Sequence, residues 1–487
     1  MENNYSWIVT TSLFLADLAI RIGFSLRVIM RKRAASVSIA WLVVILLIPF
    51  AGAALYLLFG ENRLGERRAS RLVRNRAIIK DWPLALKTRP DIDWTAVNPE
   101  CIPLDRQISA ATGIPTMPGN QLELIADAGT FFRQLIADIN QAHISIALEF
   151  YILGQGGWVD VLTEALMQAR ARGVSCRILL DSIGAKQFLR SAQATRLRDA
   201  GIELLEALPA GLIRALFVRI DLRNHRKIAI VDGKIAYTGS QNLVDPRFFK
   251  QHDGVGEWVD AMVRITGPVV EALTATFVSD WLLESKTAAR SHDGSGGIQQ
   301  VEPAGSALVQ LAPSGPGYGE DTIHNLLLTT IYAARRELIL TTPYFVPDNA
   351  ILAALKSAAQ RGVRVTVIVP EKNDSKLVHY ASHAHYDALA SAGVGIVFFT
   401  GGLLHTKTIT IDGDFCLFGS VNLDMRSFWL NFEMTLFIYD RAFTAQVRSL
   451  QQKYMAAAKP YCVETSGRRS FRQRLLENIA LLVGPLL

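Results

Sequence analysis

The sequence has little of several features that would each indicate a particular class of protein. It holds four cysteines in 487 residues, and their spacing fits neither a disulfide framework nor a cysteine-based metal site. No stretch has the G-x-x-x-x-G-K-[ST] pattern of a phosphate loop, so nucleotide use is not indicated. Residues 81–487 also lack an excess of positive charge, with 39 Lys and Arg against 40 Asp and Glu. Because a nuclease spreads positive charge around its site, we expect no nucleic-acid partner.

Histidine offers one pattern that approaches a metal site. His379 and His383 share a helical face and His385 lies beside them, but no acidic ligand motif is near. The alternative is that the three are polar residues of a helix that borders the substrate cleft. We therefore expect neither a metal nor another cofactor.

Two stretches, 180 residues apart, carry the same pattern, H-x-K-x4-D-x6-G-S-x-N. None of the other seven histidines is followed two places later by Lys, so coincidence is a poor explanation. We expect two half-sites that converge on one phosphate. Their residues are His225, Lys227, Asp232, Gly239, Ser240 and Asn242 in the first copy, and His405, Lys407, Asp412, Gly419, Ser420 and Asn422 in the second.

The residues around each motif predict a pair of strands. In both copies a β-branched, apolar run follows the Lys, ends at Asp-Gly, and gives way to a second short run. His and Lys two apart on a strand point to the same face. An imidazole can then attack phosphorus or move a proton, while the neighbouring ammonium stabilises charge on the phosphoryl oxygens. The Ser and Asn of each motif are candidates to bind the same oxygens.

A longer internal repeat indicates a duplicated domain. Arg172-Gly173-Val174 and Arg361-Gly362-Val363 lie 189 residues apart, and each leads into an apolar run. Matching segments before and after them give the order strand, helix, strand, helix, strand pair in both halves. We expect an α/β fold in which helices cover a sheet in each half.

The N-terminal region indicates membrane attachment. Residues 34–59 carry no charge and are long enough to cross about 30 Å of hydrocarbon. Residues 7–30 contain Asp17 and Arg21, which can pair on one helical face, so this segment is either a second span or an interfacial or re-entrant helix. Four Lys or Arg, namely Arg27, Arg31, Lys32 and Arg33, lie at the junction of the segments and seven lie from Arg63 to Lys80, which favours a cytoplasmic catalytic body. The second cluster is either a solvated linker or a binding site for lipid headgroups.

The C-terminal tail has an amphipathic pattern. Four arginines in residues 468–474 precede a Leu-rich and Ile-rich stretch that ends at Leu487. Such a helix suits the surface of an anionic membrane, but it could equally pack on the folded body.

The paired motif resembles the HKD signature of the phospholipase D superfamily, and the whole chain resembles the membrane-anchored bacterial cardiolipin synthases. Further matching residues are Trp258, Asp260, Gly267-Pro268, Pro343-Tyr344-Phe345, Asn431 and Glu433. The resemblance implies two phospholipase D-like α/β/α halves related by a pseudo-twofold axis, preceded by a transmembrane helical hairpin. The expected domains are residues 1–60 (hairpin), 61–120 (basic, irregular lead-in), 121–288 (first half), 289–304 (linker), 305–465 (second half) and 466–487 (amphipathic tail).

The resemblance also implies an activity without a metal. One phosphatidylglycerol would transfer its phosphatidyl group to His225, while His405 protonates the departing glycerol and later deprotonates the second phosphatidylglycerol. Lys227, Lys407, Asn242 and Asn422 would hold the phosphoryl oxygens. Family members tie the second nitrogen of each catalytic imidazole to a carboxylate, and the candidates are Asp260 and Glu433.

Three questions stay open from the sequence. Asp232 and Asp412 stand before Gly at a strand end, where a turn role is as reasonable as a catalytic one. A phospholipase D that transfers to water would use the same residues, and an inactive membrane scaffold is the third reading, which the complete motifs oppose. The expected location is the bacterial inner membrane, as a multi-pass protein, and the sequence does not indicate an oligomeric state.

Overall fold

The computed structural model describes residues 2–31, 35–61, 64, 68, 70–71, 92–209, 219–250, 253–285, 298–319, 321–462 and 470–482. These residues divide into two compact units, residues 1–69 with 210–222 and residues 70–209 with 223–487. Several predicted features fall wholly or largely outside the described residues: most of the basic cluster from Arg63 to Lys80, the linker over residues 289–297, and Arg468 and Arg469 of the tail.

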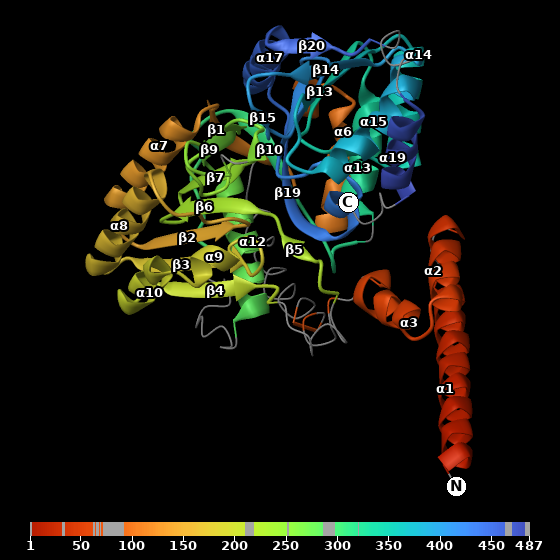
Figure 1. Ribbon diagram of the computed structural model, residues 1–487. Helices are drawn as coiled ribbons and strands as arrows, with labels where there is room; N and C mark the ends of the chain where they lie inside the picture. Colours follow the sequence, from red (N-terminus) through yellow and green to blue (C-terminus); the bar gives the residue numbers. More distant parts are fainter. Residues whose placement is uncertain are drawn as a thin grey trace. The chain divides into compact units, whose positions relative to one another are not determined.

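The N-terminal unit contains the two hydrophobic segments (Figure 1). The first is one long helix, α1 (Glu2–Met30), and its Asp17 and Arg21 pair as predicted, with Oδ2 and Nε 2.6 Å apart. The second segment is not one helix. It forms α2 (Ala35–Leu47), α3 (Ala51–Leu55) and a π-helical turn, η1 (Tyr56–Gly60). No helix in the described part of the chain combines the length and apolarity that a membrane crossing needs.

The interruption of the second segment has a local cause. Pro49 lacks an N–H and disfavours helical geometry at the residue before it, and Phe50 takes a left-handed φ of 50°. Asp17 of α1 accepts a hydrogen bond from the freed N–H of Phe50 at 3.0 Å, and Arg21 donates to the carbonyl of Leu46. The charged pair within the first segment therefore satisfies backbone groups that the break in the second segment exposes.

The second unit is built on a sheet that, among the described residues, has 16 strands. Its order is β20-β14-β13-β11-β16-β17-β19-β10-β1-β9-β7-β6-β2-β3-β4, with β5 beside β19. β1 (Met117–Ile125) and β10 (Ala307–Ser314) pair antiparallel at its centre. On one side follow β9 (Met262–Thr266), β7 (Ile235–Gly239), β6 (Lys227–Val231), β2 (Ser145–Phe150), β3 (Ser175–Asp181) and β4 (Glu203–Ala207). On the other follow β19 (Asn431–Ile438), β17 (Phe415–Gly419), β16 (Thr408–Ile411), β11 (Glu337–Thr341), β13 (Arg364–Pro370), β14 (Gly395–Phe399) and β20 (Ala458–Pro460).

The strand order confirms the predicted duplication. Moving outward from the centre, each strand of the first half has a counterpart in the second with the same relative direction. The pairs within β2-β3-β4 and β11-β13-β14 are parallel and the others antiparallel, and β20 extends the second half alone. The two halves are thus related by a pseudo-twofold axis that passes between β1 and β10. Because their sheets join edge to edge, corresponding strand ends of both halves face the same axis.

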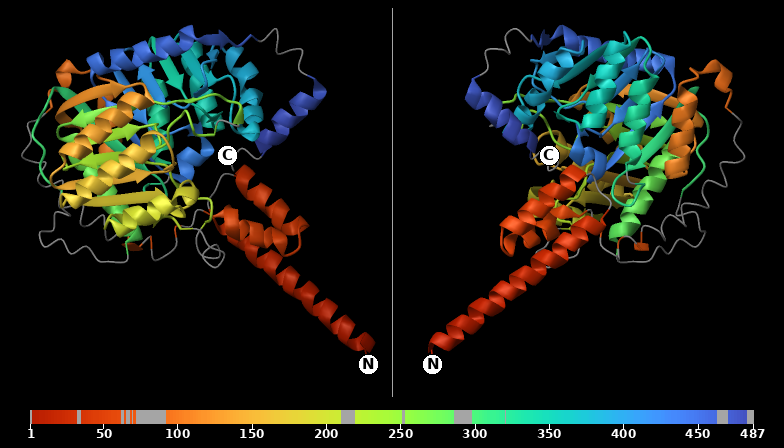
Figure 2. Two further views of the ribbon diagram at one scale, coloured as in Figure 1. Left: turned by 60° about the vertical axis from the view of Figure 1, so that its left-hand side comes forward. Right: turned by 90° about the vertical axis from the view of Figure 1, so that its right-hand side faces the viewer.

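Helices cover both faces of the sheet, giving the predicted α/β/α layers (Figures 1 and 2). The gold helices α7 (Ala128–Gln141) and α8 (Trp158–Ala171) pack side by side over the first half, and α13 (Thr322–Ala333), α14 (Asn349–Gln360) and α15 (Lys376–Ala390) belong to the second. On the other face, α12 (Val269–Glu284) and α17 (Arg441–Ala456) enclose a core with residues from both halves. The remaining helices are α6 (Cys101–Thr112), α9 (Lys186–Leu189), α10 (Ala192–Asp199), α16 (Met425–Trp429), α19 (Phe471–Leu482) and the 3-10 turn η2 (Trp94–Ala96).

The C-terminal helix α19 packs against α15, with Glu477 and Ala480 buried in the contact (Figure 1). The interpretation of the tail as a helix on the folded body is therefore confirmed for the described part of that tail. Its opposite face keeps several large apolar side chains exposed.

Candidate active site

Each motif histidine lies just before an inner strand and beside a strand of the opposite half. A short strand, β5 (Arg223–Asn224), leads into His225 and pairs parallel with β19, so the backbone N–H of His225 donates to Phe432 at 2.9 Å. In the second half β15 (Leu403–Leu404) pairs parallel with β8 (Trp258–Val259), and the N–H of His405 donates to Val259 at 2.8 Å. The same construction occurs twice, related by the pseudo-twofold axis.

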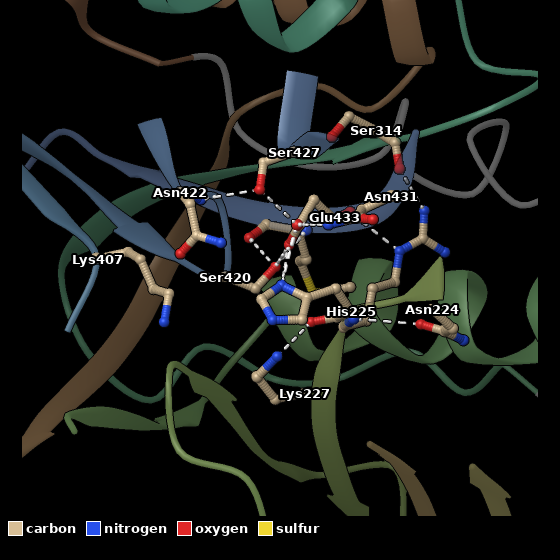
Figure 3. A network of polar contacts seen from close by, with 12 residues as sticks. Asn224, His225, Lys227, Ser314, Lys407, Ser420, Asn422, Ser427, Asn431 and Glu433 are labelled. Carbon is tan, nitrogen blue, oxygen red and sulfur yellow. Dashed lines mark hydrogen bonds and ion pairs between the residues drawn. The ribbon is translucent and has the colours of Figure 1, made fainter. Parts of the chain in front are cut away.

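This pairing gives each imidazole a carboxylate from the other half. His225 Nδ1 lies 2.9 Å from both carboxylate oxygens of Glu433 (Figure 3). His405 Nδ1 lies 2.7 Å from Asp260 Oδ1. The two residues predicted to orient the histidines are thus in place, but each serves the histidine of the opposite half. Among the described residues neither Nε2 has a hydrogen-bond partner, so each ring keeps one nitrogen available for chemistry.

Both carboxylates are buried beside positively charged or hydrogen-bonding groups. Glu433 accepts hydrogen bonds from Ser420, from Ser427 at 3.0 Å and from Asn431 at 3.1 Å, in addition to its contact with His225. Burial alone would raise the pKa of Glu433, but attraction to His225 and Lys227 holds that pKa below its usual value. Burial opposes ionisation of Asp260 as well, and His405 and Lys407 keep its pKa low. Both carboxylates are therefore ionised partners of the rings.

The hydroxyl groups of the two motif serines are hydrogen-bonded within the protein. Ser240 donates to the carbonyl of Ala261 at 3.2 Å and accepts its N–H at 3.0 Å, while Ser420 donates to Glu433 and accepts the N–H of Met434 at 3.0 Å. Both were predicted to bind the phosphate. Their hydroxyls instead fix the strand ends that carry Asp260 and Glu433.

Each motif requires glycine at this position because the backbone of a neighbouring segment lies too close for a Cβ atom. A Cβ at Gly239 would lie 2.4 Å from the carbonyl oxygen of Ala261, and one at Gly419 would lie 2.2 Å from that of Met434. Only glycine lets these strands approach the carboxylate-bearing strands so closely.

The motif lysines are buried beside the rings. Each ammonium donates to the backbone carbonyl of its own histidine at 2.6 Å, which leaves two further donors on Lys227 and on Lys407. Burial lowers the pKa of Lys227 to about 8 and that of Lys407 well below its usual value, in the latter case with added repulsion from Lys227. A bound anion would relieve both costs.

The imidazoles are neutral near pH 7. Burial is the main cause that lowers the pKa of His225 and of His405 to about 4, opposed by their carboxylate partners. A buried, neutral imidazole with one nitrogen tied to a carboxylate is a competent nucleophile or base.

The side chains of the motif asparagines are buried and only partly hydrogen-bonded. Asn242 accepts the N–H of Ile152 at 3.2 Å through its oxygen, and its side-chain nitrogen is buried with no partner among the described residues. Asn422 likewise keeps its buried side-chain oxygen without a partner in this part of the chain (Figure 3). Such buried, unsatisfied amides are costly unless a ligand completes them.

Asp232 and Asp412 do not belong to the site, which corrects their inclusion among the catalytic residues. Asp232 accepts three backbone N–H groups of residues 143–145 at 2.7–2.9 Å, and Asp412 does the same for residues 335–337. Both adopt left-handed φ values, 54° and 56°, in the hairpin turn. The five residues from Lys227 to Asp232 span roughly 16 Å of extended strand. The turn interpretation is therefore the right one.

Aromatic side chains also lie beside the two rings. The ring of Tyr151 lies 5.2 Å from that of His225, and the ring of Tyr344 lies 6.5 Å from that of His405. Trp258, 4.4 Å from His405, shields the second ring further. Trp258 and Tyr344 are among the residues that match the family, whereas Tyr151 was not named as a site residue from the sequence.

Arg226 is a second omission, and it has no counterpart in the second motif. It is fully buried, pairs with Asp280 of α12, and donates to the backbone carbonyls of Glu433 at 3.0 Å and Ser314 at 3.2 Å. The guanidinium thereby clamps the end of β19 and β10 onto the first half. The sequence did not single out Arg226, because the residue between His and Lys differs between the two copies of the motif and is Thr406 in the second.

The histidines of α15 do not assemble a metal site. His383 Nδ1 contacts the carbonyl of His379 at 2.7 Å, and burial lowers the pKa of His385 to about 4. Over the described ranges no group of three His, Cys, Asp or Glu side chains is arranged to hold a metal ion.

Comparison with known proteins assigns the chain to a family. The family model described as "Cardiolipin synthase, PLD-like domain" matches residues 135–281 and 327–454, and that of the phospholipase D-nuclease N-terminal region matches residues 19–61. Cardiolipin synthase A of Yersinia pseudotuberculosis and that of Yersinia pestis are each 43% identical over 465 residues, 96% of both chains. Among solved structures, phosphatidylserine synthase of Haemophilus influenzae superposes with a TM-score of 0.60 at 17% identity, covering 79% of this chain and all of that one, which shows the shared fold.

Proposed function

The chain belongs to the cardiolipin synthases of the phospholipase D superfamily, and we propose that it joins two phosphatidylglycerol molecules into cardiolipin and glycerol. The observation that carries the proposal is the crossed pairing of His225 with Glu433 and of His405 with Asp260. Two rings, each with one nitrogen fixed and the other available, supply the nucleophile and the acid that a two-step transfer requires.

In the first step, Nε2 of His225 attacks the phosphorus of one phosphatidylglycerol, and the bond from phosphorus to the glycerol headgroup breaks. His405 donates a proton to the departing glycerol oxygen. The negative charges of Asp260 and of the bound phosphodiester favour the protonated form of His405, although burial disfavours it in the free enzyme. Lys227, Lys407, Asn242 and Asn422 hold the phosphoryl oxygens and offset the developing charge.

In the second step, His405 accepts the proton of a hydroxyl on a second phosphatidylglycerol, and that oxygen attacks the phosphorus. The bond to His225 breaks and the product is cardiolipin. One phosphodiester is lost and one is formed, so the transfer needs no energy source. The side chain of His225 is 9% exposed and that of His405 3%, which supports exclusion of water from the intermediate.

The runner-up is a phospholipase D that uses water as the acceptor, and an inactive scaffold is opposed by the complete set of site residues. Purified full-length protein in phosphatidylglycerol vesicles, with products resolved by mass spectrometry, separates the readings. We expect cardiolipin and glycerol with phosphatidic acid as a minor product, and reversal on addition of glycerol. Phosphatidic acid as the dominant product, unaffected by glycerol, would identify a hydrolase, and no turnover would identify a scaffold.

We also propose that residues 1–60 hold the enzyme in the bacterial inner membrane with the catalytic body on the cytoplasmic side. Exposed apolar side chains along α1 and α2, including Trp7, Phe14 and Leu47, support burial in lipid. The internally satisfied Asp17 and Arg21 remove the main cost of such burial. Protease applied to sealed inverted vesicles should digest the catalytic body, and protection there would reverse the orientation.

A further inference from the structure

The outward face of α19 is a concentrated apolar surface on the catalytic unit. Phe471, Leu475, Ile479 and Leu482 are spaced four, four and three residues apart, which places them along one stripe of the helix. Their exposed fractions are 76%, 46%, 49% and 81%, and Leu476 adds a fifth at 38%. Among the described residues of the catalytic unit no other helix exposes as many large apolar side chains.

The helix itself is anchored, so the exposed stripe is not a consequence of loose packing. Its inner face buries Glu477 and Ala480 against α15, where Ala480 joins a cluster with Val378 and Ala381. Burying one face of a helix while leaving its other apolar face in water is unfavourable, unless something apolar covers that face.

The charges on the helix indicate what covers it. Arg472 and Arg474 are exposed at its N-terminal end, and the sequence places Arg468 and Arg469 just before. The helix has a single acidic residue, Glu477, and it lies on the buried face. Arginines that flank an apolar stripe complement a surface with negative headgroups over hydrocarbon.

The position of α19 links this face to the reaction. The cluster that holds Ala480 also includes Val346, with Tyr344 packed against it, and the Tyr344 ring lies 6.5 Å from that of His405. A contact with lipid at α19 would therefore be made close to the chemistry.

We propose that the outward face of α19 is a second membrane contact, which seats the catalytic unit on an anionic bilayer beside the active site. The inference rests on the proposed function in that the substrate is an anionic lipid. Attachment by residues 1–60 keeps the enzyme at the membrane, whereas α19 presents the site to lipid headgroups, so that two substrate molecules can enter in succession.

A labelling experiment tests the contact without relying on turnover. Cys462 is exposed, and the other three cysteines are buried, with burial raising the pKa of their thiols to about 11 or 12. The full chain with Cys462→Ser and Ile479→Cys therefore takes a polarity-sensitive dye at one site, and Gln452→Cys on the exposed surface of α17 gives the matched control.

In phosphatidylglycerol vesicles we expect the dye at position 479 to shift to shorter wavelength and to be quenched by spin-labelled lipids, while the dye at position 452 does neither. Equal behaviour at the two positions would refute the contact. A shift at 479 without quenching by lipid would refute it too, because the face would then be covered by protein, either another segment or a second copy.

A kinetic comparison tests the role. Leu475→Gln with Ile479→Gln keeps residues that favour a helix but removes the apolar stripe, and should raise KM for vesicle phosphatidylglycerol roughly fivefold or more at unchanged kcat. Turnover of a short-chain, monomeric phosphatidylglycerol should not change. Val161→Gln with Tyr332→Gln, at exposed apolar positions on α8 and α13, should affect neither substrate. An unchanged vesicle KM, or an equal loss on the monomeric substrate, would overturn the proposal, whereas a wild type that yields phosphatidic acid would overturn only the proposed function.

Discussion

Replacement of Glu433 by Gln is the sharpest test of the crossed pairing. The substitution keeps the size of the side chain and an acceptor for His225 Nδ1–H, but removes the charge from a fully buried position. Hydrogen bonds to charged groups contribute about 1.5–3 kcal/mol, so loss of the charge-assisted part predicts a fall in kcat/KM of roughly 10- to 100-fold. Glu433 also raises the pKa of His225, so the acid limb of the pH profile should move to lower pH.

The control is Thr435→Val, two residues along the same strand. Thr435 is 4% exposed, and its hydroxyl has no partner in the described part of the chain, so the isosteric change should leave activity and melting temperature close to wild type. If Glu433→Gln retains kcat/KM within twofold of wild type, or if Thr435→Val loses as much, the orienting role of Glu433 is wrong.

The matching change in the other half assigns the two roles. Asp260→Asn should impair protonation of the leaving oxygen by His405, so a phosphatidyl ester with a good leaving group such as p-nitrophenol should restore the rate of the first step. The same substrate should not rescue Glu433→Gln, because nucleophilic attack by His225 is still needed. The opposite pattern of rescue would exchange the roles of the two histidines.

Three further outcomes follow from the structure. His225→Ala and His405→Ala should each abolish synthesis, and the double variant should be no worse than either, since the two act as one unit; substantial activity in a single variant, assayed on vesicles, would contradict a shared site. Asp232→Asn should lower the free energy of unfolding by about 1–3 kcal/mol, because the side chain binds three N–H groups less strongly, and should leave kcat of the folded enzyme near wild type. Lys227→Ala should show the opposite pattern, a loss of kcat without a comparable change in melting temperature. Because burial lowers the pKa of His225 to about 4 and the bound phosphodiester favours the protonated form of His405, kcat at saturating substrate should stay high down to well below pH 6.5; an acid limb centred at 6.5 would show a solvated nucleophile.

The imidazoles also bear on stability, and the sign follows from proton binding. Their pKa is lower in the folded state than in the unfolded chain, so the unfolded state binds more protons between pH 6.5 and about 4. Stability should therefore fall as pH drops through that window. His225→Gln should make this fall shallower in thermal inactivation measured between pH 7 and pH 4.

Local sequence patterns were sufficient for the elements of the fold and for the two motifs. Alternating apolar runs that end at Asp-Gly specify a strand pair, and the repetition of that pair specifies a duplicated α/β domain. The N-terminal segments show the limit of such reasoning. The prediction of one span over residues 34–59 rested on their apolar character and took no account of Pro49. The effect of Pro49 on the backbone interrupts the helix, so two short helices form there.

The sequence by itself determined which residues are candidates for the chemistry: two His and Lys pairs, two Asn and two carboxylates, all named from spacing and resemblance. Only the tertiary structure decided how they combine. Glu433 reaches His225 across 208 residues and Asp260 reaches His405 across 145, because β5 pairs with β19 and β15 with β8. Hydrogen bonds between strands so distant in the chain depend on how the two halves meet, and neither spacing nor composition records that. Only the tertiary structure likewise showed that the hydroxyls of Ser240 and Ser420 bond to residues beside or at the carboxylates, Ala261 and Glu433.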